Sequence, residues 1–272
     1  MTSRLRRLLA DREREAGARQ ALESELNVAR RIQAKLLPPD RDLFPDETRF
    51  AVRGLNIPAS SVGGDFFDYF TTDDARLVLA IGDVCGKGVP AALVMAVCRT
   101  AVREFARSGL PPAEIAARVN DVLLRDATDG TFVTLVVADY DPASGTLRYV
   151  NAGHPAPLHL RADGRIEGLG ASCPALGVAP LEEVGGVRSS TLRLAPGDAV
   201  LMFTDGVTEA RDESGTMLRD LGLRSLVQRV LEHSPDADPE QICRICVRGL
   251  LRFQRGDVAD DLTLLCLRTT GA

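Results

Sequence analysis

Four short segments centred on aspartate stand where apolar runs, each typical of a buried strand, are expected to end. They are Gly63-Gly64-Asp65, Ile81-Gly82-Asp83-Val84, Phe203-Thr204-Asp205-Gly206 and Asp260-Asp261-Leu262-Thr263. One such end is ordinary turn chemistry, because Asp and Gly commonly terminate strands. Four of them, with almost no His or Cys at comparable places, indicate one site built from oxygen ligands. Hard cations such as Mg²⁺ and Mn²⁺ prefer that kind of site.

Length and composition allow one large domain with an extension, because the chain has 272 residues and 45% of them are hydrophobic. The formal net charge is -5 and the pI is about 5.4, so no basic field for nucleic acid is evident. No apolar stretch approaches the roughly 20 residues that span a bilayer. The charged N-terminus lacks the apolar core of a signal peptide. We therefore expect no nucleic-acid partner, no membrane span and a cytoplasmic location.

Six cysteines show no disulfide-like framework for a chain of this size. Cys243 and Cys246 have C-x-x-C spacing but fall within 241–253, which is typical of an apolar helix. No second pair of ligands accompanies them, so they are interpreted as core residues rather than a zinc or redox site. This use of cysteine fits a reducing cytoplasm.

Residues 4–37 are predicted to form one helix that ends at Pro38-Pro39. Its apolar positions alternate by four and three, as in the seam of a coiled coil, at Leu22, Leu26, Ala29, Gln33 and Leu36. Upstream, the same register places charged residues on the seam. Two interpretations stay open for the segment 1–39. It is a linker that pairs with another copy or a regulator through residues 1–37, or it packs on its own domain.

The rest of the chain alternates runs of strands with two helical pairs. Strands are predicted at 49–55, 66–70, 76–82, 131–140, 145–151, 156–161, 188–194, 198–204 and 262–268. Helices are predicted at 88–107, 112–126, 219–232 and 239–254. Several strands join through short turns, which favours an α+β fold with antiparallel sheets over a doubly wound parallel sheet. The segment 170–187, rich in Gly, Pro and Ala, is predicted to be an irregular loop.

The segment 82–88 resembles a phosphate-binding loop between a strand and a helix, but its spacing is wrong for nucleotide binding and Gly88 replaces the expected Ser or Thr. Its glycines still let exposed amides face an oxyanion, so Gly86, Lys87 and Gly88 are candidate phosphate contacts. No Ser-hydrolase elbow and no EF-hand loop are present. His154 is interpreted as a turn residue rather than a general acid.

In order along the chain come the segments V-G-G-D-F-F-D, I-G-D-V-C-G-K-G, N-A-G-H-P, F-T-D-G-V-T-E-A and D-D-L-T. Together they resemble the metal-dependent protein phosphatase (PPM, type 2C) family. More narrowly, they are similar to its bacterial SpoIIE/RsbU-like subgroup, the regulators of partner-switching sigma-factor pathways. The resemblance covers 45–269, and the helix before it, around 29–38, is similar to the linker of that subgroup.

This resemblance implies an αββα four-layer sandwich of two antiparallel sheets flanked by helices, with two Mn²⁺ or Mg²⁺ ions at one end. By motif, Asp83 would bridge both ions and the Val84 carbonyl would join it on the first. Asp205 and Asp260 would hold the second ion, and Asp65 would complete the first. Asp260 is preferred to Asp261 because the first residue of the matching tetrapeptide is the family ligand.

The resemblance also implies a protein serine/threonine phosphatase that hydrolyses a phosphoserine or phosphothreonine monoester through water activated by both ions. Its implied substrate is a STAS-type anti-sigma-factor antagonist. A single general acid or base supplies only about 10²–10⁴ in rate, far below the roughly 10²¹ that phosphate monoester hydrolysis can require, so two cations suit the task better than His154 alone. The alternatives are a catalytically weak regulatory interaction module and a metal phosphohydrolase of small molecules.

Overall fold

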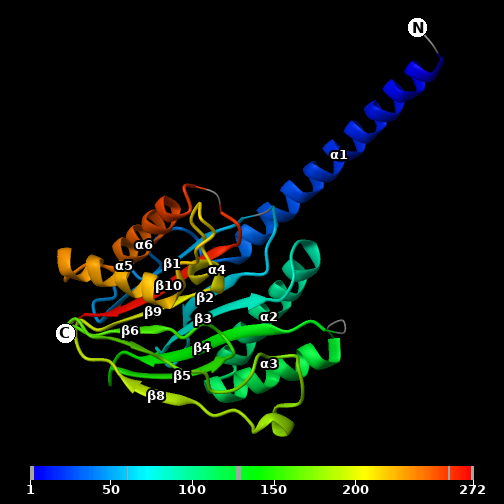
Figure 1. Cartoon of the computed structure of the whole chain (residues 1–272). Helices are drawn as coiled ribbons and strands as arrows, with labels where there is room; N and C mark the ends of the chain where they lie inside the picture. Colours follow the sequence, from blue (N-terminus) through cyan, green and yellow to red (C-terminus); the bar gives the residue numbers. More distant parts are fainter. Residues whose placement is uncertain (1–2, 60, 127–129, 257, 271–272) are drawn as a thin grey trace.

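The chain folds into four layers, helix, sheet, sheet and helix, with a long N-terminal helix projecting from the body (Figure 1). The computed structural model describes residues 3–59, 61–126, 130–256 and 258–270. This architecture confirms the expected αββα sandwich. In the described part of the chain, no helix is both long and apolar enough to cross a bilayer.

Both sheets have five strands, and every pairing between strands is antiparallel. The first sheet has the order β1 (Phe50–Ile57), β10 (Leu262–Thr269), β9 (Ala199–Phe203), β6 (Leu158–Leu160) and β7 (Ile166–Gly168). The second has the order β2 (Phe66–Thr71), β3 (Leu77–Val84), β4 (Val133–Asp141), β5 (Thr146–Ala152) and β8 (Ser190–Arg193). Central strands are apolar on both faces because each sheet is covered on both sides.

Two pairs of helices cover the outer faces of the sheets (Figure 1). They are α2 (Val89–Arg107) and α3 (Pro112–Asp126) on the second sheet, and α5 (Arg219–His233) and α6 (Pro239–Phe253) on the first. A helix pair and a sheet enclose each outer apolar layer, and the two sheets enclose a middle layer that contains Tyr69, Ile81 and Met202. Helix α6 begins with a capping box between Asp238 and Gln241, which satisfies backbone groups at its start.

The expected elements are all present, with small shifts at their ends. Three short elements were not predicted: β7, the one-turn helix α4 (Asp205–Thr208), and the 3₁₀ helix η1 (Leu181–Val184), which lies inside the predicted irregular loop. Such short pieces depend on tertiary contacts more than on local pattern.

One expectation about the aspartates was wrong. Asp65 and Asp260 precede strands β2 and β10 instead of following strands, and Asp83 lies within β3. The physical reason is the antiparallel pairing, in which the start of one strand and the end of its neighbour lie at the same edge. A strand start therefore brings a carboxylate to the site as well as a strand end does.

Helix α1 (Ser3–Leu36) leaves the body as a single rod (Figure 1). Leu26, Ala29, Gln33 and Leu36 are half-buried, whereas Leu22 is 57% exposed. The C-terminal part of the predicted seam therefore faces its own domain, where α1 contacts α2. For that part of the helix, packing on its own domain is the interpretation that the structure favours.

Cys243 and Cys246 are fully buried in α6, within the layer between α5, α6 and the first sheet. Burial raises the pKa of Cys246 to about 12, so its thiol stays protonated and is a poor zinc ligand.

We expect each Cys→Ala change at Cys243 and Cys246 to lower the free energy of unfolding by about 1 kcal/mol through lost packing. Stoichiometric zinc that the double variant loses would contradict this core role; thermal unfolding and metal analysis provide the measurements.

Candidate active site

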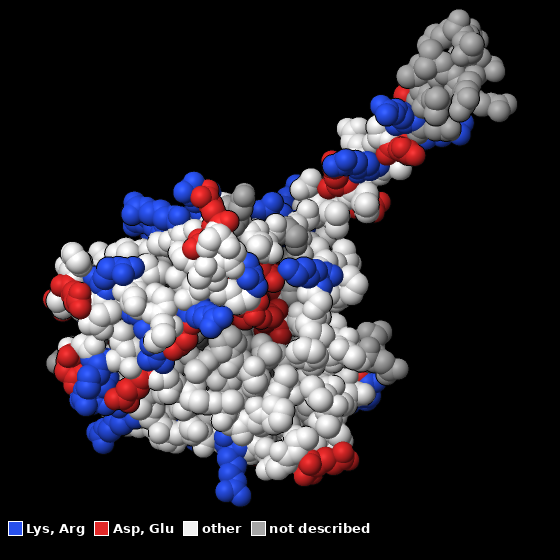
Figure 2. All heavy atoms as spheres, in the orientation of Figure 1, with Lys and Arg blue, Asp and Glu red and all other residues white. Residues whose placement is uncertain are grey.

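One end of the sandwich gathers two pairs of carboxylates, one pair from each sheet. Asp65 and Asp83 come from the adjacent strand ends of β2 and β3. Asp205 and Asp260 flank the paired strands β9 and β10. Figure 2 shows acidic side chains in a hollow on the face it presents. Asp65, Asp83 and Asp260 line one cavity of about 100 Å³, so three of the four Asp-centred segments meet there. Asp205 does not line that cavity, but its charge acts on Asp83 and raises the pKa of that carboxyl.

Asp65 joins the two sheets at this end. Its Oδ2 accepts hydrogen bonds from Thr204 Oγ1 at 2.7 Å and from Thr263 Oγ1 at 2.5 Å, although both threonines belong to the first sheet's side of the sandwich. Asn56 Nδ2 in turn donates to Thr263 Oγ1 at 2.8 Å. No role is predicted from the sequence for Thr204, Thr263 or Asn56. The signal for the threonines was present, because both lie inside the Asp-centred segments.

Glycines allow the backbone to approach closely at the site. A Cβ on Gly64 would lie 2.5 Å from the Val84 carbonyl oxygen and 3.2 Å from Asp83 Oδ1. A Cβ on Gly206 would lie 2.1 Å from the Asp261 carbonyl oxygen. Only glycine fits at either position, so the carboxylates and the Val84 carbonyl converge because side chains are absent between them.

Electrostatic repulsion is concentrated among these acids. Burial and the charge of Asp83 raise the pKa of Asp65 well above its usual range. Burial and the charge of Asp205 raise the pKa of Asp83 to about 7. Burial and the charge of Glu209 raise the pKa of Asp205, and Glu209 is a nearby acid without a predicted role. Such a cluster favours the binding of positive charge.

Asp261 and Lys87 have partners of their own. The Asp261 carboxylate accepts a hydrogen bond from the Ala59 amide at 2.8 Å, and burial raises its pKa. Lys87 Nζ lies 3.0 Å from Asp260 Oδ2. Gly86 and Gly88 both adopt positive φ, as a sharp loop between strand and helix requires. Gly86 and Lys87 line the carboxylate cavity, while Gly88 precedes the first residue of α2.

The donor set suits hard divalent cations, because it consists of carboxylates and a backbone carbonyl. The glycines leave room between these groups, since they carry no side chains. Among the side chains that the structure describes, no three acids, histidines or cysteines are already arranged as a cation cage. Their present partners give the reason: Asp65 faces two threonines, Asp260 faces Lys87 and Asp261 faces Ala59. Mutual repulsion also keeps uncompensated carboxylates apart.

His154 lies behind the site instead of in it. Its Nδ1 is 2.8 Å from Thr134 Oγ1, and Thr134 is the β4 partner of Asp83. The backbone amide of His154 donates to Asn151 Oδ1 at 2.9 Å, which closes the expected turn. Burial lowers the pKa of His154 to about 3, although the nearby Phe203 carbonyl opposes the shift. A histidine in this environment is neutral near pH 7.

We expect His154→Ala to reduce activity by roughly tenfold or less, because the ring contacts Thr134 and, being neutral at pH 7, is not the imidazolium that a general acid requires. Steady-state kinetics beside Asp83→Asn measures the difference. A folded His154→Ala protein as inactive as the Asp83 variant would show that the histidine takes part in the chemistry.

A two-sheet sandwich with helices on both faces and carboxylates at one end defines a metal-dependent phosphatase domain of the PP2C type. The sequence model described as "Stage II sporulation protein E (SpoIIE)" matches residues 73–270. The chain belongs to this family, which confirms the resemblance.

Relatives and solved structures agree with that membership. The chain is 29% identical over 254 residues to "Phosphoserine phosphatase RsbU" of Bacillus subtilis, covering 93% of this chain and 72% of the relative. The crystal structure of "the RsbU and RsbW domains of Rv1364c from Mycobacterium tuberculosis" has a TM-score of 0.69 and 29% identity, covering 82% of this chain and 60% of that one. The "SiaA-PP2C domain of Pseudomonas aeruginosa" has a TM-score of 0.77 at 24% identity, covering 93% and 98%. For three further curated relatives, the matching region spans 41%, 45% and 24% of the relative's own length.

Proposed function

We propose that this protein is a metal-dependent serine/threonine phosphatase that removes the phosphoryl group from a regulatory phosphoprotein. The observation that carries the proposal is the meeting, in one cavity, of Asp65 and Asp83 from one sheet with Asp260 from the other, with Asp205 close enough for its charge to act on Asp83. The catalytic domain is assigned to 45–269 and the linker to 1–39. The fold supports this division, because strand β1 begins at Phe50 and β10 ends at Thr269.

In this proposal Asp65, Asp83 and the Val84 carbonyl would hold one Mn²⁺ or Mg²⁺ ion, and Asp205 and Asp260, together with Asp83, would hold a second. When bound, the two ions supply an activated water and offset the charge of the phosphoryl group. The chain's own residues position the ligands. Thr204 and Thr263 orient Asp65 through their hydroxyl groups.

The substrate that we propose is a phosphorylated STAS-type anti-sigma-factor antagonist. Support comes from RsbU, which is named a phosphoserine phosphatase, and from the Mycobacterium tuberculosis chain in which an RsbU domain occurs with an RsbW domain. We place the activity in the cytoplasm, because all six cysteines are free thiols.

Dephosphorylation with Mn²⁺ tests the proposal on three substrates: a phosphorylated STAS protein, p-nitrophenyl phosphate and a sugar phosphate. We expect release of phosphate from the STAS protein with the highest kcat/KM, and none after chelation or in Asp83→Asn. Preference for the sugar phosphate would favour a small-molecule phosphohydrolase. No turnover of any substrate would favour a regulatory interaction module.

We also propose that α1 connects the site to a partner. Gln33 Nε2 donates to the Gly63 carbonyl at 2.7 Å, and the Gly63 amide donates to Gln33 Oε1 at 3.2 Å. Gly63 is two residues from Asp65, so the docking of α1 bears directly on a proposed ligand. The exposed residues 12–25 remain available to a second copy or a regulator, and light scattering of the full chain tests pairing.

We expect Gln33→Ala to raise the Mn²⁺ concentration for half-maximal activity by about tenfold, the range typical of residues that orient ligands. The matched control is Gln20→Ala, an exposed residue of the same helix, which should match wild type. Activity titrated against Mn²⁺ provides the measurement. Superimposable titrations of wild type, Gln33→Ala and Gln20→Ala would show that the contact is passive.

A further inference from the structure

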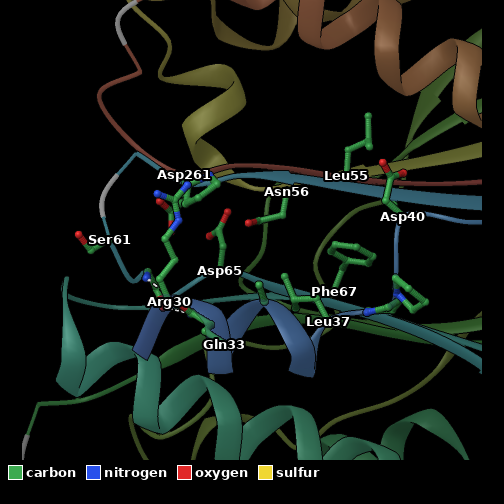
Figure 3. A pocket seen from close by; sticks show the side chains of 16 residues that line it. Arg30, Gln33, Leu37, Asp40, Leu55, Asn56, Ser61, Asp65, Phe67 and Asp261 are labelled. Atoms are coloured by element: carbon green, nitrogen blue, oxygen red, sulfur yellow. Dashed lines mark hydrogen bonds between the residues drawn. The ribbon is translucent and has the colours of Figure 1, made fainter. Parts of the chain in front are cut away.

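A cavity of about 330 Å³ lies between the C-terminal part of α1 and the sandwich (Figure 3). Its apolar side includes Leu37, Leu55 and Phe67, and its polar side includes Arg30 and Gln33. The same cavity reaches Gly63, Asp65 and Asp261, which also line the smaller carboxylate cavity. The two spaces therefore share a wall made of residues of the proposed active site.

Arg30 is the cation on the polar side of this cavity. In Figure 3 its side chain rises from α1 toward Asp261. Among the residues that the structure describes, Arg30 forms no hydrogen bond and no ion pair. One turn later, Gln33 holds α1 in place through two hydrogen bonds to Gly63. Helix α1 is therefore fixed beside the site, and the five N–H groups of the exposed Arg30 guanidinium remain free for a ligand.

The other cations near the two cavities are already engaged. Lys87 pairs with Asp260 at 3.0 Å. Arg53 is buried and pairs with Asp40 at 2.8 Å and with Glu240 at 3.5 Å. A phosphate dianion that approaches Asp65 and Asp261 meets repulsion from both carboxylates, so a cation of the protein on this side favours its binding in addition to the metal ions.

We propose that Arg30 binds the phosphoryl group of the substrate, so that α1 supplies a substrate-binding residue to the active site of the domain that follows it. This inference rests on the proposed phosphatase function and adds the residue that recognises the phosphate. A guanidinium suits the task because its planar fork can donate two parallel hydrogen bonds to phosphate oxygens and stays charged at every working pH.

The experiment compares Arg30→Ala, Arg30→Lys and Arg31→Ala in the full chain. Arg31 is the matched control, because it is the next arginine on the same helix, is exposed and does not line the cavity. Kinetics on p-nitrophenyl phosphate gives KM, and inorganic phosphate as product inhibitor gives an inhibition constant. The stabilisation of the Mg²⁺-loaded protein against heat by inorganic phosphate gives a readout without turnover.

We expect Arg30→Ala to raise KM and the phosphate inhibition constant by about tenfold or more, as the loss of a charge-assisted contact predicts. Arg30→Lys should recover part of the effect, Arg31→Ala should match wild type, and the Mn²⁺ titration should not move. Unchanged KM and phosphate inhibition in Arg30→Ala would overturn the inference. So would a shifted Mn²⁺ titration with an unchanged KM, which indicates a structural role.

The failure of this inference is distinguishable from failure of the proposed function. A wild-type protein that turns over no phosphate ester defeats the function. Phosphate stabilisation lost in Arg30→Ala but kept in Arg31→Ala would still support phosphate recognition by Arg30. An active wild type whose phosphate stabilisation is the same in Arg30→Ala defeats the inference alone.

Discussion

Asp83→Asn is expected to lower kcat by more than about 100-fold, since even residues that only orient metal ligands cost 10- to 100-fold when removed. Asp83 is the penultimate residue of β3, where carboxylates of both sheets converge, and asparagine keeps its shape while removing the charge that offsets a cation. Asp205→Asn, on the other sheet, should give the same loss. Kinetics at saturating Mn²⁺ measures both, and full activity in either variant would falsify the assignment of these ligands.

Asp83→Asn is also expected to change how the stability of the metal-free protein depends on pH. The pKa of Asp83 is about 7 in the folded chain against an ordinary value of 3.8. Between these values the folded metal-free protein holds a proton that the unfolded chain releases, so stability falls as pH rises from about 4 through 7. Asp83→Asn should remove part of that fall and raise Tm at pH 8 by several degrees, at about 2–4 °C per kcal/mol. Thermal unfolding with chelator checks this, and a lower Tm at pH 8 contradicts it.

Gly64→Ala is expected to lower activity by about 100-fold without removing any ligand. Its new Cβ would lie 2.5 Å from the Val84 carbonyl oxygen, which belongs to the backbone of β3 and cannot rotate away. To relieve this clash, the end of β3 must move relative to Asp65. That movement changes the spacing of three proposed ligand groups at once, namely Asp65, Asp83 and the Val84 carbonyl. Activity against Mn²⁺ concentration, together with Tm, separates this local effect from unfolding.

Gly170→Ala is the matched control for that substitution. Nothing lies within 4 Å of the Cβ it would carry, so the same methyl group should leave activity unchanged. If Gly64→Ala keeps wild-type activity and Mn²⁺ dependence, the close approach of Gly64 to β3 is not needed for function.

The amino-acid pattern predicted most of the fold because local and tertiary preferences agree in the long elements. The apolar run 77–81 and the amphipathic run 239–253 form β3 and α6 as expected. Helix α4 was missed because a single turn after β9 has too few residues to show a helical period.

The candidate site was predicted in its residues but not in their arrangement. Asp65, Asp83, Asp205 and Asp260 stood out as motif positions, yet only the antiparallel register shows how a strand start meets a strand end. The bonds from Thr204 and Thr263 to Asp65 cross 139 and 198 residues of chain. No local pattern encodes such pairings. Gln33 was read as a seam position, and its bond to Gly63 depends on where the domain places that glycine.

Since each sheet contributes its own carboxylate pair, the depth of the middle apolar layer sets how far apart the pairs stand. Side chains such as Ile81 and Met202 act there as spacers. A change of a single methylene in that layer alters the spacing of the sheets in a close-packed interior. Apolar substitutions deep in the sandwich are therefore expected to change catalytic activity in this chain, although they alter no charged residue.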